Sequence, residues 1–401
     1  IFLLPASLAL LGWNSVAGWV LTIAGGMCLA ATFAWLARAM PVNGGPYAYT
    51  AAAFGPMTAF AVTWSYWVSL WIGNAAIAVA GISYFGVFVP GLSTFPGGDA
   101  LAACVLIWAL TLLNLRGARA AGQFQLVTTL IKIVPLVLVI VLAAIALGSG
   151  DARLAPLPAG GLEAGVVTAA ATLTLWGLLG LESATVPAGR IKDPERNIPF
   201  ATLLGTALTG LLYLVTCSAI ILLMPPEVIG ASAAPFADFV ERFWAPGPAL
   251  LIAAFAAISC FGALNGWILV QAELPYAMAR DGTFPAWFAR ANPAGVPARA
   301  MVVSSVLMTL VVLLNYESSA AEIFTFLLLV STCCTLFMYL VCMAAAMQLR
   351  LGGTYASRSW LPWVAGLAVL YSAWTIYGAG GEAVAWGLAL LVLALPAYYL
   401  F

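Results

Sequence analysis

The sequence predicts an all-α polytopic membrane protein, and three observations lead to this fold class. Of the 401 residues, 64% are hydrophobic and only 7% are charged, which is too few charges to cover the surface of a soluble protein. Apolar runs of about 20 residues, the length of a helix that crosses a bilayer, recur along the whole chain. The basic residues fall in alternate connections between these runs.

Breakers such as glycine, proline and charged residues divide the chain into twelve predicted spans. These lie at 1–12, 17–38, 56–89, 100–115, 123–148, 164–188, 199–224, 246–278, 299–315, 320–349, 360–379 and 382–401. The first, IFLLPASLALLG, is too short to cross a bilayer, so we expect a first helix truncated in its N-terminal half. Because Ile1 already belongs to an apolar run, we expect no cleavable signal peptide.

The basic residues support this division. Loops after even-numbered spans hold eleven of the 14 lysines and arginines, whereas loops after odd-numbered spans hold only Arg153 and Arg242, and Lys132 falls within a span. The eleven are Arg38, Arg116, Arg119, Arg190, Lys192, Arg196, Arg280, Arg290, Arg299, Arg350 and Arg358. Cytoplasmic loops of membrane proteins are enriched in lysine and arginine, so both termini are predicted to be cytoplasmic.

Two of the predicted spans are interrupted, at 1–12 and at 164–188. They lie five spans apart and therefore cross the membrane in opposite directions. Paired discontinuous helices at corresponding positions are typical of transporters built from inverted repeats, with a substrate site at mid-membrane. The sequence therefore predicts a transport pathway between these two segments.

Glu182 is the only carboxylate within the apolar, glycine-interrupted stretch TAAATLTLWGLLGLESATVPAG. A charged side chain at the centre of a bilayer costs roughly 2.5–3.5 kcal/mol on insertion scales, so such residues usually face a cavity and have a function. Gly177 and Gly180 weaken the helix at this point, and a broken helix within a membrane must line a protein-enclosed or watery site. Two interpretations stay open: a group that exchanges a proton, and a carboxylate that hydrogen-bonds the broken backbone.

Other polar and aromatic residues lie inside spans. Asn74 is either a substrate contact or the partner in an interhelical hydrogen bond. Trp176 and Trp267 lie away from the span ends where tryptophan usually collects, so they either stack on a cation or pack in the core. Lys132 is expected to pair with an acid or to extend towards the cytoplasm, and Glu273 is expected to be solvated at the inner end of its span.

Several function classes are excluded by what the sequence lacks. It has no G-x-x-x-x-G-K-[ST] motif for ATP hydrolysis and no histidine for metal binding or base catalysis. The seven cysteines lie in apolar spans without a C-x-x-C pair, as expected of small core residues. With a net charge of zero, nothing indicates a nucleic-acid partner. We therefore expect no enzyme activity, no catalytic residue, no metal and no cofactor.

Eight motifs in order along the chain carry a family resemblance. They are IFLLPASLA, NGGPYAYTAAAFGP, YWVSLWIGN, LTLWGLLGLESATV, KDPERNIPFAT, SAAPFADF, GALNGWILVQAE and ARDGTFPAWFAR. On these motifs the sequence resembles the amino acid–polyamine–organocation superfamily, in particular its basic amino acid/polyamine antiporter branch and, within it, the bacterial arginine/agmatine antiporters.

The resemblance implies a leucine-transporter-like fold with helices 1 and 6 broken. Its first inverted repeat would be 1–148, its second 164–349, and its peripheral helices 360–401. It also implies exchange of an external amino acid, such as arginine, for an internal amino acid or decarboxylated amine, such as agmatine, across a bacterial inner membrane. A homodimer is compatible with it. A proton-coupled symporter of the same fold, an exchanger of neutral amino acids, and a sensor or channel are the alternatives.

The resemblance further assigns roles to residues at matching positions. Trp176 and Tyr66 would be gates, and Trp267 would stack on the cationic end of the substrate. Asn74 would contact substrate, and Glu182 would sense protons.

The remaining site residues follow from the same comparison, with departures from the family pattern. Ser69 and Leu70 take the place of the small pair at the head-group pocket, and Ile77 lies one turn beyond Asn74. Backbone from Leu179 onwards would hold half of the carboxylate site, because the family's G-S-G would precede Ile1. A polar contact expected in FLLLVST falls on Leu329, with Ser331 two residues on. Because leucine cannot bind a guanidinium, lysine, ornithine and neutral amino acids stay open as substrates.

Overall fold

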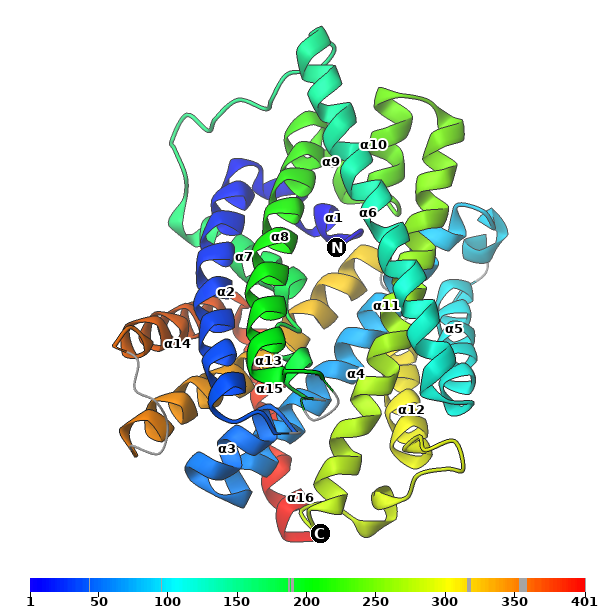
Figure 1. Ribbon diagram of the computed structural model, residues 1–401. Coiled ribbons are helices and arrows are strands. Elements are labelled where there is room, and N and C mark those ends of the chain that lie inside the picture. The colour runs from blue at the N-terminus through cyan, green and yellow to red at the C-terminus, as the bar shows by residue number, and fades with distance from the viewer. Residues whose placement is uncertain are drawn as a thin grey trace.

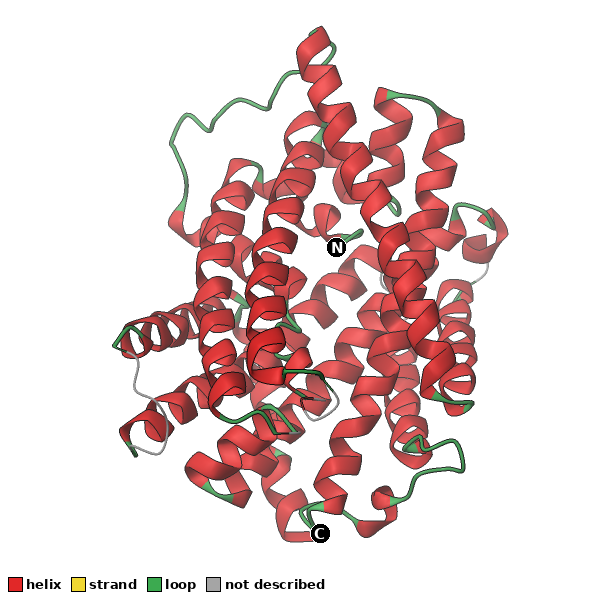
Figure 2. Cartoon of the chain, in the orientation of Figure 1, coloured by secondary structure: helices red, strands yellow, loops and turns green. Residues whose placement is uncertain are grey.

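The computed structural model describes residues 1–401 except 43, 95, 187, 189–190, 316–318, 353–358 and 401, and the side chains of 93, 118–125 and 400 are also not described. Within the described chain, the regular structure is helical throughout (Figure 2). The predicted fold class is therefore confirmed. Arg190 and Arg358, and the side chain of Arg119, lie outside the described residues.

Nine helical segments of the described chain are long and apolar enough to cross a bilayer (Figure 1). They contain α2 (Trp13–Ala39), α4 (Pro56–Gly86), α5 (Gly98–Leu115), α6 (Ala118–Ser149), α7 (Ala164–Leu175), α8 (Pro194–Leu223), α11 (Pro246–Arg280), α13 (Ala320–Leu351), and α15 (Gly381–Val392) with α16 (Ala394–Leu400). The other three predicted spans correspond to α1 (Leu4–Leu8), α12 (Ala298–Leu314) and α14 (Leu361–Gly378). The helices thus fall where the spans were predicted, while the count of twelve membrane crossings stays a prediction.

Short helices lie in the connections. α3 (Pro46–Phe54) precedes α4, and α9 (Pro226–Ala231) and α10 (Pro235–Phe243) lie between α8 and α11. Each begins with a proline in its first turn, where the missing N–H costs no hydrogen bond and the fixed φ suits a helix. α13 begins at a capping box, in which the Ser319 hydroxyl accepts from the Glu322 amide and the Glu322 carboxylate accepts from the Ser319 amide.

The predicted interruption within 164–188 is present in the structure, whereas 1–12 holds a short helix that ends where the chain connects to α2. α1 passes into a 3-10 turn, Ala9–Leu11, and α2 begins after Gly12, where φ is +48°. α7 stops at Leu175 and is followed by a 3-10 turn, extended backbone at Leu179, and Gly180 at φ +99°. A φ in this left-handed region favours glycine, so Gly180 marks the point where the helix breaks.

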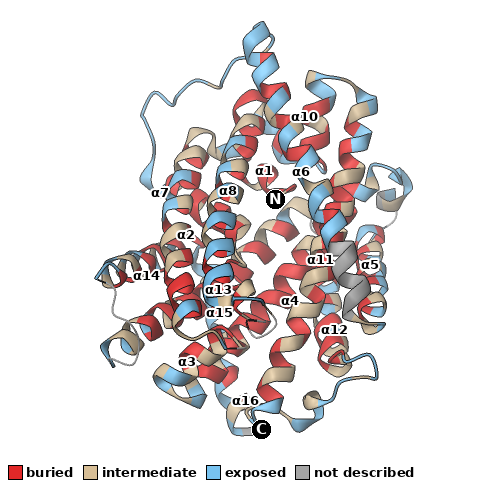
Figure 3. Cartoon of the chain, in the orientation of Figure 1, coloured by how far each residue is buried: buried red, intermediate tan, exposed pale blue. Residues whose placement is uncertain are grey.

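The long helices pack in two groups around the breaks. α4 packs along α11 and α13, while α2 packs along α7 and α8. Of the most apolar 18-residue stretch in α4, 78% is buried, whereas 22% of the corresponding stretch in the α15–α16 segment is buried. Figure 3 colours the chain by burial. α4 therefore lies at the centre of the bundle and the last helices at its edge. Exposed leucines and valines on α5, α6 and α8 give an apolar outer surface suited to lipid.

Candidate functional site

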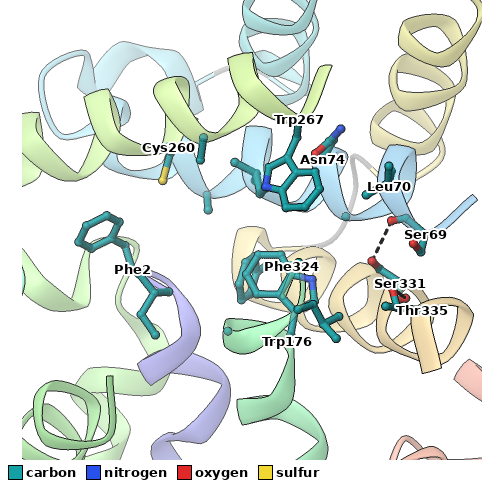
Figure 4. A pocket seen from close by; sticks show the side chains of 18 of the residues that line it. Phe2, Ser69, Leu70, Asn74, Trp176, Cys260, Trp267, Phe324, Ser331 and Thr335 are labelled. Atoms are coloured by element: carbon teal, nitrogen blue, oxygen red, sulfur yellow. Dashed lines mark hydrogen bonds between the residues drawn. The ribbon is translucent and has the colours of Figure 1, made fainter. Parts of the chain in front are cut away.

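A cavity of about 180 Å³ lies where the broken segments meet α4, α11 and α13 (Figure 4). Its lining includes the predicted site residues Tyr66, Ser69, Leu70, Asn74, Ile77, Trp176, Leu179, Glu182 and Trp267. These residues lie far apart in the sequence, and the fold brings them to one place. Their roles in binding, gating and proton sensing stay predictions.

Two tryptophans face each other across this cavity. Trp267 extends from α11, and Trp176 extends from the turn that follows α7 (Figure 4). The Trp176 ring also packs edge-to-face on Phe324 of α13, with centroids 5.3 Å apart and an angle of 83° between the planes. Because their faces and edges border an open space rather than a filled core, both rings are placed to contact a ligand as well as to pack.

Gly73 of α4 leaves space beside the cavity for Ser331 and Trp176. A Cβ at Gly73 would lie 2.8 Å from Ser331 Oγ and 3.8 Å from Trp176 Nε1. Ser331 itself donates a hydrogen bond of 2.8 Å to the carbonyl oxygen of Ser69. A side chain at residue 73 would therefore separate α4 from α13 and narrow the cavity beside Trp176.

Asn74 is buried and has both features that the sequence left as alternatives. Its side chain lines the cavity, and its Nδ2 donates a hydrogen bond of 2.7 Å to Oε1 of Gln271 on α11. Gln271 is fully buried, and its Nε2 contacts Sδ of Met308 on α12 at 3.2 Å. The interhelical hydrogen bond therefore exists, and it leaves the Asn74 carbonyl oxygen available to the cavity.

Glu182 is completely buried beside two tyrosines. The hydroxyl of Tyr339 donates a hydrogen bond to its Oε2, and the amide of Gly180 in turn donates to the Tyr339 hydroxyl over 3.4 Å. The Tyr66 hydroxyl lies near the same carboxyl group and interacts with it. Tyr339 thus links the acid to the broken backbone, and the carboxyl group lies between two tyrosine hydroxyls.

Two expectations from the sequence need correction. Leu329 does not line the cavity; it is a partly buried side chain packed against the core, and Ser331 lines the cavity from the same helix. Two residues turn an α-helix by about 200°, so only one of these two side chains can face the site. Among the described residues, Lys132 has no acidic partner, and its side chain turns to the cavity instead. It lines the cavity with its ammonium 5.2 Å from the Tyr213 ring centroid.

Sequence reasoning also missed several lining residues, among them Phe2, Cys260, Phe324 and Thr335. Phe324, Ser331 and Thr335 are seven and four residues apart, which places them on one face of α13. That spacing was a usable signal. Nothing comparable distinguishes Phe2 or Cys260 from their apolar neighbours.

A cavity beside a broken helix inside an apolar helical bundle is typical of membrane transporters. Residues 1–391 match the family model described as amino acid permease. The chain is 31% identical to the cadaverine/lysine antiporter of Escherichia coli (strain K12) over 321 residues, which are 80% of this chain and 72% of that protein. It is 29% identical to the putrescine transporter PotE of the same strain over 395 residues, 96% of this chain and 88% of that protein. The PotE protein of Haemophilus influenzae is 30% identical over 395 residues, with 96% and 89% covered.

The chain therefore belongs to the amino acid permease family of the amino acid–polyamine–organocation superfamily, in the basic amino acid/polyamine antiporter branch. The family predicted from the eight motifs is confirmed. The match to transporters along almost the whole chain also confirms that the protein is a permease and not an enzyme.

Proposed function

We propose that this protein exchanges an external basic amino acid for an internal amino acid or its decarboxylated amine. The observation that carries the proposal is the placement of Trp176, Trp267, Asn74 and Glu182 around one cavity at a helix break. Such a cavity offers aromatic faces and a carbonyl oxygen to a cation. The backbone groups at the helix break can receive a carboxylate. Arginine with agmatine is the pair suggested by the sequence motifs, and the names of the relatives add lysine with cadaverine, and putrescine.

Each lining group has a role in this proposal. The cationic end of the substrate stacks on Trp267, because the face of an indole attracts cations. The backbone at Leu179 and Gly180 receives the substrate carboxylate, as broken helices do in transporters of this kind. Trp176 and Tyr66 close the site, and Glu182 between Tyr66 and Tyr339 responds to protons.

Transport proceeds by alternating access. The broken segments with α2 and α8 rock against a scaffold that contains α4 and α11, and the substrate stays at the break. In support, α2 packs along α7 and α8 while α4 packs along α11. We place the protein in a bacterial inner membrane with both termini in the cytoplasm. A homodimer is compatible with this arrangement.

Purified protein in proteoliposomes tests the exchange. Vesicles are preloaded with agmatine, cadaverine, lysine or buffer alone, and labelled arginine or lysine is supplied outside. We expect uptake into vesicles that hold an exchange partner and little uptake into vesicles that hold buffer. Equal uptake in loaded and empty vesicles would reject obligate exchange. Uptake of alanine or leucine at the same rate as arginine would favour an exchanger of neutral amino acids.

One observation favours a second function, proton-coupled symport. The ammonium of Lys132 lines the cavity beside Tyr213, where a buried amine is able to take up and release a proton during the cycle. A symporter would fill empty vesicles when a pH gradient alone is imposed, and a Lys132→Ala variant would lose that uptake. An exchanger would show neither effect.

A further inference from the structure

Three buried side chains form a line that ends at the cavity. Met308 of α12 is fully buried and its sulfur is 3.2 Å from Gln271 Nε2. Gln271 Oε1 accepts the hydrogen bond of 2.7 Å from Asn74 Nδ2, and the Asn74 side chain lines the cavity beside Trp267 (Figure 4). Each of the three residues comes from a different helix, so the line crosses the bundle from α12 through α11 to α4.

The chemistry of the three groups fixes a single direction for the hydrogen bonds. A thioether sulfur accepts weakly and cannot donate, so the amide NH₂ of Gln271 turns towards Met308 and its carbonyl oxygen towards Asn74. Asn74 must then donate its own NH₂ to that oxygen. The opposite orientation would leave the Gln271 carbonyl oxygen against sulfur, with a buried acceptor unpaired at a cost of about 1–3 kcal/mol.

The consequence for the site is that Asn74 presents an acceptor. With its NH₂ held by Gln271, the remaining polar atom of Asn74 is the carbonyl oxygen. An ammonium or guanidinium group can donate to this oxygen, whereas an aliphatic side chain would leave it without a hydrogen bond. An unfixed asparagine could turn either end to the cavity and would discriminate less.

We propose that Gln271 is a positioning residue that sets the carbonyl oxygen of Asn74 towards the cavity, so that the site selects amino acids whose side chain ends in a hydrogen-bond donor. This inference rests on the proposed exchange of basic amino acids and identifies what selects them. Because α4 and α11 pack along each other, the hydrogen bond between Asn74 and Gln271 stays intact while the broken segments move. Gln271 itself does not line the cavity, so it acts through Asn74.

The test compares ligands that differ only in the donor group. In vesicles preloaded with the exchange partner, uptake of labelled lysine or arginine, whichever the wild-type protein exchanges, is inhibited with unlabelled lysine or with norleucine. Norleucine has the same four-carbon chain as lysine without the ammonium group. The measured quantity is the ratio of the half-inhibiting concentrations, norleucine over lysine.

Removing the side-chain amide of Gln271 should lower the ratio of half-inhibiting concentrations. Gln271→Leu leaves Asn74 free to turn, and we expect the ratio to fall by about tenfold, the effect of weakening one hydrogen bond to a charged group. Gln271→Glu keeps an oxygen facing Asn74 and should keep the ratio at or above the wild-type value. Met308→Leu removes the sulfur that directs Gln271 and should lower the ratio in the same direction, by a smaller factor.

A buried amide on α5 supplies the matched control. Asn114 Nδ2 donates to Oδ1 of Asn265 on α11 over 2.9 Å, and neither residue lines the cavity. Asn114→Leu removes an interhelical amide pair of the same kind and should leave the inhibition ratio unchanged, even if it lowers stability.

The outcomes separate the inference from the function on which it rests. If the wild-type protein exchanges no basic amino acid, the proposed function fails before any variant is compared. If it does exchange one and Gln271→Leu leaves the ratio unchanged, the positioning role is overturned and the amide pair is structural only. If Gln271→Leu does not fold, Met308→Leu decides: a lowered ratio supports the role and an unchanged ratio overturns it.

Discussion

The indole of Trp267 lies directly against the backbone of Gly180. A Cβ at residue 180 would come 2.8 Å from Cζ2 and 2.9 Å from Cη2 of this ring, closer than real Cβ atoms approach their neighbours. Gly180 also has φ +99°, in the region that side chains disfavour. One glycine therefore allows both the break in the helix and the position of the aromatic wall, and the two features depend on each other.

Gly180→Ala should accordingly damage both stability and exchange. We expect a loss of unfolding free energy of about 1–3 kcal/mol from the strained backbone conformation, together with displacement of the Trp267 ring. Exchange should fall at least about tenfold, since misplacing a contact by a small distance has large effects on a bound geometry. Thermal unfolding in detergent and proteoliposome exchange measure the two effects.

Gly205→Ala on α8 is the control for this change, because a Cβ there meets no described residue within 4 Å and the residue is helical. It should leave exchange intact and should not lower stability. If both alanine variants behaved alike, Gly180 would have no special function at the break.

Glu182→Gln should alter how exchange depends on pH. The substituted amide would keep the size of the side chain and an oxygen for the Tyr339 hydroxyl, but it could neither lose nor gain a proton at neutral or mildly acidic pH. We therefore expect exchange that varies less with external pH than in the wild-type protein. Initial rates across an external pH series at fixed internal pH measure this.

Tyr339→Phe serves as the companion variant, since it removes the donor to Glu182 and also the acceptor for the Gly180 amide. It should shift the pH profile without flattening it, because the carboxyl group is still present. A Glu182→Gln protein with the wild-type pH profile would remove the proton-sensing role while leaving the transporter assignment untouched.

Replacing Trp267 should selectively weaken the binding of basic substrates. Trp267→Leu removes the aromatic face but keeps an apolar side chain, and loss of a desolvated cation–π contact of about 1–2 kcal/mol would raise the half-saturating concentration about five- to thirtyfold. The half-saturating concentration of Trp267→Phe should lie between those of the wild-type protein and Trp267→Leu. Equal half-saturating concentrations in all three would show that the ring only packs.

The sequence predicted the helices well because their signals are local. Apolar runs end at prolines and glycines, and the break at Gly180 was visible as a glycine beside a lone acid. Site residues were harder to assign wherever neighbours in space decide them. Leu329 and Ser331 both lie in a run of apolar and small residues, and only the rotation of α13 against α4 shows that Ser331 faces the cavity.

Two other features were invisible from the sequence for the same reason. The direction of Lys132 depends on the ring of Tyr213, which comes from a helix much further along the chain. Gln271 drew no attention within GWILVQAE, because its importance arises from contact with Asn74 and Met308 on two other helices. Pairwise contacts across a bundle leave no periodic signal in a single sequence.

The eleventh predicted span offers a test of packing that does not depend on transport. On α14, the Tyr371 ring occupies the space beside Gly25 of α2, where a Cβ would lie 2.2–2.4 Å from ring atoms, and its hydroxyl donates to Thr22 Oγ1 over 3.0 Å. Gly25→Ala should therefore destabilise the protein by about 1–3 kcal/mol through overpacking, which forces α2 and α14 apart.

Tyr371→Phe, which keeps the ring and removes one hydrogen bond, should lower the unfolding free energy by about 1 kcal/mol. Within the described part of the chain, a Cβ at Gly366 on α14 meets nothing within 4 Å, so Gly366→Ala should not destabilise the protein. If Gly25→Ala unfolded at the same temperature as Gly366→Ala, α14 would not be held against α2 by this contact, and the helix would be free to separate from it during the transport cycle.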